Sequence, residues 1–194
     1  ALSRYGYAEG VADFIVRIEN DKKYSFRLVN ELFDTFSADK AELAAMVFDK
    51  CEDYMKINVI KAISEYRLSE FEPMYIEGMS SKNPAMRIAC VKALGDLANP
   101  ENEQLLITAT YDKDWVVRSS AVKGLGKINT PKSLEGIKEA IKDKEWWVRQ
   151  SAAGALINRN VSVSDIEDIL GGYDKYASDA VKYALYRSID MKEG

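Results

Sequence analysis

The sequence predicts an all-α fold, a right-handed superhelix or solenoid of about six stacked helical hairpins. Three observations carry this prediction: an internal period of 31 residues, an apolar stripe at helical spacing in each copy, and few helix breakers, with four prolines and eleven glycines in 194 residues. Apolar residues make up 47% of the chain and charged residues 30%, which is typical of an ordered protein with a sizeable core. A two-helix unit of this length cannot bury both its faces alone, so neighbouring copies are expected to stack.

The repeat is clearest in three segments that align without gaps, each with an arginine in the same place. These arginines are Arg87, Arg118 and Arg149. Steps of 31 residues backward reach Lys56 and then Ser25 with the apolar pattern kept, and a step forward reaches Ser178 after a shortening of two residues. The chain is therefore expected to form a single domain of six repeats. Their approximate ranges are 7–37, 38–67, 68–98, 99–129, 130–160 and 161–190.

Each copy is expected to contain two helices. Around the arginine position, apolar residues stand one before it and three, four and seven after it, which places them on one stripe of a helix with 3.6 residues per turn. A shorter helical pattern precedes this second helix in each copy. The joints between copies are rich in Asn, Asp, Pro and Gly, as in residues 97–102 and 128–133, which suits helix ends and starts.

The residue types that are missing exclude several kinds of chemistry. The chain has no histidine, which excludes Ser-His-Asp and Cys-His nucleophiles and His-ligated metals, and it has no glycine-rich phosphate loop. Its two cysteines, Cys51 and Cys90, form no C-x-x-C pair and fit a reducing compartment. We therefore expect a protein that is not an enzyme and that has no cofactor and no metal site.

The charge and hydropathy of the chain bear on its partners and location. A net charge of -4 and a pI near 5.1 do not favour nucleic acid or an anionic membrane. The longest apolar runs, such as residues 44–48, are far too short to span a bilayer. We expect a cytoplasmic protein without a membrane span in this chain, although a segment upstream of Ala1 could tether it to a membrane.

One repeat pattern resembles a known family. The pattern D-x-x-x-x-V-R-x-x-A-x-x-A-L-G occurs over Asp112 to Gly126 and less completely over Asp143 to Leu156. It resembles the HEAT-like repeats that are named after the phycobilisome lyases and are common in bacterial proteins. The resemblance covers essentially the whole chain and implies an armadillo/HEAT-type fold. It is strongest in the third to fifth copies, and the more divergent end copies are expected to cap the stack.

The recurring aspartates and arginines are interpreted as structural. Catalysis needs one site, whereas a repeat supplies copies of the same pair. In the resembled family these side chains tie adjacent repeats together, cap helix starts and bind backbone groups. The residues of this structural ladder are Arg87, Asp112, Arg118, Asp143 and Arg149.

Positions that differ between copies are the candidates for partner binding. In proteins that this chain resembles, the second helices line the concave face, and the variable positions face outward from it. All three tryptophans stand at one edge of these helices, and lysines recur at one position in three consecutive copies. The predicted partner-binding residues are Tyr54, Lys61, Lys92, Trp115, Ser119, Lys123, Trp146, Trp147, Gln150, Tyr176 and Tyr183.

A row of lysines beside large aromatic side chains suits an acidic or amphipathic segment of another protein. We therefore expect a non-catalytic protein-protein interaction scaffold. Two alternatives stay open. One is a lyase or chaperone-like helper of the phycobilisome-lyase type, and the other is a HEAT-like nucleic-acid-binding protein, since alkylpurine DNA glycosylases are built from similar helical pairs. The oligomeric state and the identity of the partner are left open by the sequence.

Overall fold

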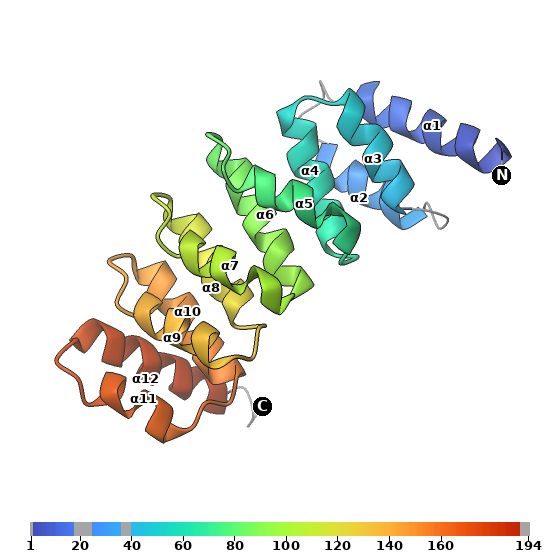
Figure 1. Cartoon of the computed structure of the whole chain (residues 1–194). Coiled ribbons are helices and arrows are strands. Elements are labelled where there is room, and N and C mark those ends of the chain that lie inside the picture. The colour runs from blue at the N-terminus through green and yellow to red at the C-terminus, as the bar shows by residue number, and fades with distance from the viewer. Residues whose placement is uncertain (1, 18–24, 36–39, 191–194) are drawn as a thin grey trace. The chain divides into compact units, whose positions relative to one another are not determined.

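The computed structural model describes residues 2–17, 25–35 and 40–190. Residues 18–24 and 36–39 of the first two predicted repeats lie outside the described residues, as do Ala1 and residues 191–194. Within the described ranges the chain forms α-helices and short 3-10 turns and no strand (Figure 1). The helices are α1 (Leu2–Arg17), α2 (Ser25–Thr35), α3 (Lys40–Lys50), α4 (Asp53–Ser64), α5 (Glu72–Gly78), α6 (Pro84–Leu97), α7 (Glu103–Ala109), α8 (Trp115–Leu125), α9 (Pro131–Ala140), α10 (Trp146–Asn158), α11 (Val163–Leu170) and α12 (Lys175–Asp190).

These helices follow one another as six pairs, one pair in each predicted repeat. The chain divides into two compact units, with the boundary between Ala93 and Leu94 inside α6. In the first unit, α1 packs on α3 and α2 packs on α4. In the second unit, α7 packs on α9, and α8 and α12 both pack on α10. First helices thus pack on first helices and second on second, so the predicted all-α repeat fold is confirmed. A single domain for the whole chain stays a prediction.

The period of 31 residues is also visible in the backbone. Among the residues that the structure describes, three other than glycine have a positive φ, and each lies within three residues of the end of a second helix: Arg67 at 51°, Ala98 at 53° and Asn160 at 51°. Arg67 and Ala98 are 31 residues apart, and Asn160 stands two periods after Ala98. A left-handed residue is a common way to end a helix, because it turns the chain and satisfies the last carbonyl groups. The second, third and fifth repeats therefore share a helix ending as well as an apolar stripe.

The predicted stripe of the second helices forms the core of each unit. Seven residues after the arginine position, Ile63, Leu94, Leu125 and Leu156 have no exposed surface. Three residues after it, the side chains of Val59, Cys90, Ala121, Ala152 and Val181 are equally buried. Burial raises the pKa of the Cys90 thiol to about 12, so this cysteine is a small core residue and not a reactive one.

Glycine allows one close approach between second helices. In the second unit, a Cβ atom placed on Gly95 in the last turn of α6 would lie 2.6 Å from the Cα atom of Gly124 in α8. Because carbon atoms do not approach each other so closely, the two helices can pack at this distance only with glycine at both positions. Over the described residues, no helix combines the length and the apolar character that crossing a bilayer requires.

Candidate partner-binding surface

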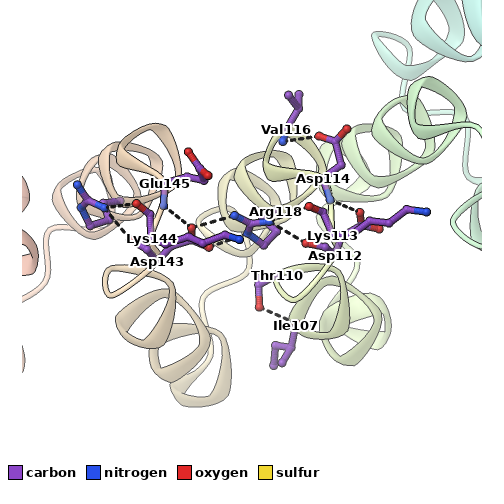
Figure 2. A network of polar contacts seen from close by, with 11 residues as sticks. Ile107, Thr110, Asp112, Lys113, Asp114, Val116, Arg118, Asp143, Lys144 and Glu145 are labelled. Carbon is purple, nitrogen blue, oxygen red and sulfur yellow. Dashed lines mark hydrogen bonds and ion pairs between the residues drawn. The ribbon is translucent and has the colours of Figure 1, made fainter.

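A buried ion pair joins two neighbouring repeats of the second unit. Arg118 of α8 donates from Nη1 to the carbonyl oxygens of Asp112, at 2.8 Å, and of Lys113, at 3.3 Å, in the loop before its own helix. Its Nε and Nη2 atoms donate to the two carboxylate oxygens of Asp143, at 2.7 and 3.0 Å (Figure 2). One guanidinium therefore holds its own loop and the loop of the next repeat.

Asp143 completes this joint at the start of α10. Its Oδ1 atom also accepts a hydrogen bond from the Glu145 N–H at 2.8 Å (Figure 2). The side chains of Arg118 and Asp143 are only 7% and 11% exposed. Burial would raise the pKa of the Asp143 carboxyl, but the hydrogen bonds from Arg118 and the Glu145 N–H, together with the charge of Arg118, hold it below its ordinary value. The hydrogen bond to Asp143 in turn raises the pKa of Arg118. These residues have a structural role, in which both charges are paired.

The same loop contact recurs at the other two arginines. Arg87 donates from Nη1 to the carbonyl oxygen of Ser81 at 2.9 Å, and Arg149 donates from Nη1 to those of Asp143 and Lys144 at 2.7 and 2.9 Å. The Nε atom of Arg149, however, is buried and has no hydrogen-bond partner. Arg149 thus keeps the contact with its own loop and lacks the second half of the joint.

The three tryptophans form one exposed cluster. Trp115 begins α8, and Trp146 and Trp147 begin α10. The ring of Trp147 stacks on Trp115 with centroids 6.5 Å apart and meets Trp146 edge to face at 4.5 Å. The three side chains nevertheless stay 40%, 46% and 58% exposed for Trp115, Trp146 and Trp147. Aromatic pairing therefore fixes their geometry, and a large apolar surface is left in contact with solvent.

A pocket of about 430 Å³ opens beside this cluster, between α10 and α12. The guanidinium of Arg149 lies over the ring of Tyr176, 5.4 Å from its centroid. The pocket is lined by Trp146, Arg149, Gln150, Tyr176, Asp179, Ala180 and Tyr183. Four of these residues, Trp146, Gln150, Tyr176 and Tyr183, are among the predicted partner-binding residues, and the structure brings them together.

Two residues that line the pocket, Arg149 and Asp179, were not predicted as partner-binding residues. Arg149 was expected only in the structural ladder, and Asp179 was not singled out at all. The sequence does contain a signal for Arg149, because the last copy has Gly172 where the two copies before it have Asp112 and Asp143. Asp179 has no comparable signal, since only the packing of α12 on α10 brings it to the pocket.

The remaining predicted residues lie on second helices of both units. In the second unit, Lys123 of α8 is exposed. In the first unit, Lys92 of α6 and Tyr54 of α4 are exposed, whereas Lys61 of α4 is half-buried.

The expectation that Ser119 is exposed is wrong. Its side chain is 6% exposed, and its Oγ atom shares a hydrogen bond of 2.7 Å with the Oγ atom of Ser151 on α10. Ser119 faces the neighbouring second helix, α10, and meets a small side chain there. Variation between copies therefore does not always indicate exposure.

A second pocket lies in the first unit. It has a volume of about 590 Å³ and combines methionines with charged side chains, among them Met74, Met86, Lys56 and Glu77. None of its lining residues was predicted as a site. Among the described residues, no group of three or more Cys, Asp or Glu side chains is arranged to hold a metal ion.

Comparisons with known proteins relate the chain to helical repeat proteins. The family model described as HEAT repeats matches residues 73–157 and, in an overlapping second match, residues 102–189. A solved complex of CpcE and CpcF of phycocyanin lyase from Nostoc sp. PCC7120 contains a chain that is 20% identical, with 73% of this chain and 95% of that chain covered and a TM-score of 0.55. At this identity the likeness concerns the fold alone.

A structure of human deoxyhypusine hydroxylase in complex with glycerol is 12% identical, with 92% of this chain and 96% of that chain covered and a TM-score of 0.44. No curated protein sequence matches the chain significantly.

Proposed function

The chain belongs to the HEAT-repeat family, and we propose that it is a non-catalytic scaffold that binds another protein. The proposed binding surface is the exposed face of the second helices, which is expected to be concave as in the proteins that the sequence resembles. Its centre is the tryptophan cluster of Trp115, Trp146 and Trp147 with the adjoining pocket. The bacterial cytoplasm stays the predicted location, and no cofactor is proposed.

The observation that supports this proposal best is the exposed area of three clustered tryptophans. Large apolar side chains on a protein surface are unfavourable in water, and contiguous exposed apolar patches are typical of interaction sites. Tryptophan is enriched among the few interface residues that contribute most of the binding free energy. Because the rings are already fixed by stacking, they lose little conformational entropy when a partner covers them.

Repetition supports a binding function rather than catalysis. The ionisable pair of Arg118 and Asp143 forms a structural joint between repeats, and the contact of the arginine with its own loop recurs at Arg87 and Arg149. The chain contains no histidine, and its Cys90 thiol is protonated at neutral pH because burial raises its pKa. We therefore assign it no reaction.

The test is affinity capture followed by mass spectrometry, with wild-type chain and the double variant Trp115→Ala/Trp146→Ala. Each truncation at the centre of an interface should remove about 2 kcal/mol or more, so the double variant should weaken a direct partner's binding by about a thousandfold or more. The matched control is Tyr111→Ala, because Tyr111 is an exposed aromatic residue of the same unit that lies two residues after the end of the first helix α7, outside the tryptophan cluster.

Partners that the tryptophan variant loses and the tyrosine variant keeps would support the surface. Partners that bind both variants and the wild type equally well would place the binding site elsewhere. Far-UV circular dichroism of the three proteins checks that the helices are intact.

A further inference from the structure

Arg149 lacks the carboxylate that its equivalent one repeat earlier binds. Both arginines donate from Nη1 to two carbonyl oxygens of the loop before their own helix. Arg118 uses its other two nitrogens for the carboxylate of Asp143, 25 residues further along the chain. In Arg149 the Nε atom is buried without a partner, and Nη2 makes no hydrogen bond to any described residue. Two donors in the fork that normally receives a carboxylate are therefore unused.

The chain itself cannot supply the missing group at the equivalent position. In register with Asp112 and Asp143, the last copy has Gly172, which has no side chain. A Cβ atom on Gly172 would lie 2.6 Å from the carbonyl oxygen of Asp168, so the backbone leaves no room for an aspartate there. The missing carboxylate is therefore explained by the local backbone conformation as well as by the glycine at this position.

Arg149 lines a pocket that an outside group can enter. Arg149 lines the pocket of about 430 Å³ together with Trp146, Tyr176 and Tyr183, whose rings provide apolar and aromatic walls. Asp179 also lines this pocket, yet it forms no ion pair with Arg149 within 4 Å. The pocket thus combines a cation without a paired carboxylate, three aromatic rings and one carboxylate at its border.

We propose, on the basis of the scaffold function above, that Arg149 binds an aspartate or glutamate side chain of the partner protein. The partner's carboxylate accepts a hydrogen bond from Nη2 and, after a rotation of the exposed Tyr176 side chain, a second from Nε. It thereby takes the position relative to Arg149 that Asp143 takes relative to Arg118. An apolar side chain next to the acidic residue packs on Trp146.

The chemistry favours a carboxylate on a side chain. A guanidinium presents two parallel N–H groups that match the two oxygens of a planar carboxylate, and the preceding repeat already binds an aspartate in this way. Because aromatic rings restrict the approach of water, the ion pair is screened less than one on an open surface. A side-chain rotation at an interface is a common change on binding.

The test uses a library of short random peptides that is displayed on phage and selected on the full chain. Selected peptides are synthesised with acetylated and amidated ends, and their dissociation constants are measured by fluorescence anisotropy. The expected peptides share an Asp or Glu beside an apolar residue. Replacement of that residue by Asn or Gln should weaken binding to the wild type by about tenfold to a hundredfold, as for a lost hydrogen bond to a charged group.

Variants of the chain assign this effect to Arg149. With Arg149→Gln, the acidic peptide and its amide analogue should bind within about twofold of each other. With Arg149→Lys, which keeps the charge and loses the fork, the discrimination should be intermediate. Lys132→Gln is the control for the loss of one positive charge, because Lys132 is an exposed residue of α9 outside the pocket, and it should behave as the wild type.

Asp179→Asn tests the site by a gain of affinity and does not depend on the stability of the Arg149 variants. Asp179 is exposed, so its substitution should leave the fold intact. Removal of its negative charge from the pocket should tighten binding of the acidic peptide by about twofold to fivefold and leave the amide analogue unchanged.

The outcomes separate the carboxylate site from the scaffold function. Peptides that need Trp115 and Trp146 but bind equally well with amide in place of acid overturn the role of Arg149 alone. Binding that depends on a free C-terminal carboxylate or on a phosphate also overturns it, since the proposed group is a side-chain carboxylate. A library that yields no peptide dependent on the two tryptophans overturns the scaffold surface and the carboxylate site together.

Discussion

At the scale of single residues, Arg118 and Arg149 occupy the same position of the repeat but make different contacts. Both side chains bind the loop before their own helix, and only Arg118 also binds a carboxylate. The sequence predicted the structural ladder because the arginines recur every 31 residues. It also contained the exception, Gly172, but a missing side chain becomes informative only when the geometry shows which donors it leaves unused.

Substitution of the two arginines should have different effects on stability. Arg118→Gln leaves the buried Asp143 carboxylate uncompensated, which should lower the free energy of unfolding by about 3–5 kcal/mol. Arg149→Gln removes hydrogen bonds to two carbonyl groups and no ion pair, so about 1–2 kcal/mol is expected. Urea unfolding followed by far-UV circular dichroism measures both.

Adding Asp143→Asn to Arg118→Gln provides the control for this comparison. If the ion pair explains the difference, the second substitution should cost much less in the Arg118→Gln background than in the wild type. Equal losses of unfolding free energy for Arg118→Gln and Arg149→Gln would contradict a stabilising role of the ion pair between Arg118 and Asp143.

At the scale of helices, most of the fold could be predicted and most of the pocket could not. The apolar stripe and the helix-ending signals recur with the period, and they specify the two helices of each copy. Interactions between helices depend on which residues meet across a contact. Ser119 is buried because Ser151 meets it, and Arg159 reaches back to the carbonyl oxygens of Ile128 and Thr130, at 2.8 and 3.0 Å. No pattern within one helix predicts such contacts.

Two glycines in neighbouring second helices should respond oppositely to alanine. A Cβ atom on Gly124 of α8 would lie 2.8 Å from the Cα atom of Gly95, so Gly124→Ala should destabilise the protein by about 1–3 kcal/mol through overpacking. A Cβ atom on Gly154 of α10 meets nothing within 4 Å, so Gly154→Ala should stabilise it by about 0.5–1 kcal/mol through better helix propensity.

Thermal unfolding of the two variants beside the wild type measures this contrast. A melting temperature that rises for both variants would show that the approach of α6 and α8 is not limited by these glycines.

At the scale of the whole molecule, the absence of histidine predicts a flat dependence of stability on pH near neutrality. Histidine is the side chain whose ordinary pKa lies between about 5 and 8, and the chain has none. The carboxyls of Asp143 and Asp165 have lowered pKa values in the folded state, Asp165 because of hydrogen bonds from Ser162. The contribution of these two carboxyls to the free energy of unfolding is present above the unfolded pKa of about 3.9. It is lost as the pH falls through their pKa values in the folded state.

The alkaline side has the opposite sign. Cys90 has a folded pKa of about 12, whereas an unfolded thiol ionises near pH 8.5. Above about pH 8.5 the unfolded state releases a proton that the folded state keeps, so stability should fall as the pH rises. Urea midpoints measured from pH 3 to pH 10 should therefore form a plateau between about pH 6 and 8 with a decline on each side. A steep slope within the plateau would contradict this account.

The joint between Arg118 and Asp143 has a consequence for how such a chain can change in length. Arg118 binds the aspartate of the following repeat, and that repeat carries both this aspartate, Asp143, and an arginine, Arg149, in register with Asp112 and Arg118. A duplicated segment of 31 residues, inserted in register, thus brings both halves of the interface with it. Gene duplication can lengthen the array without the evolution of a new contact.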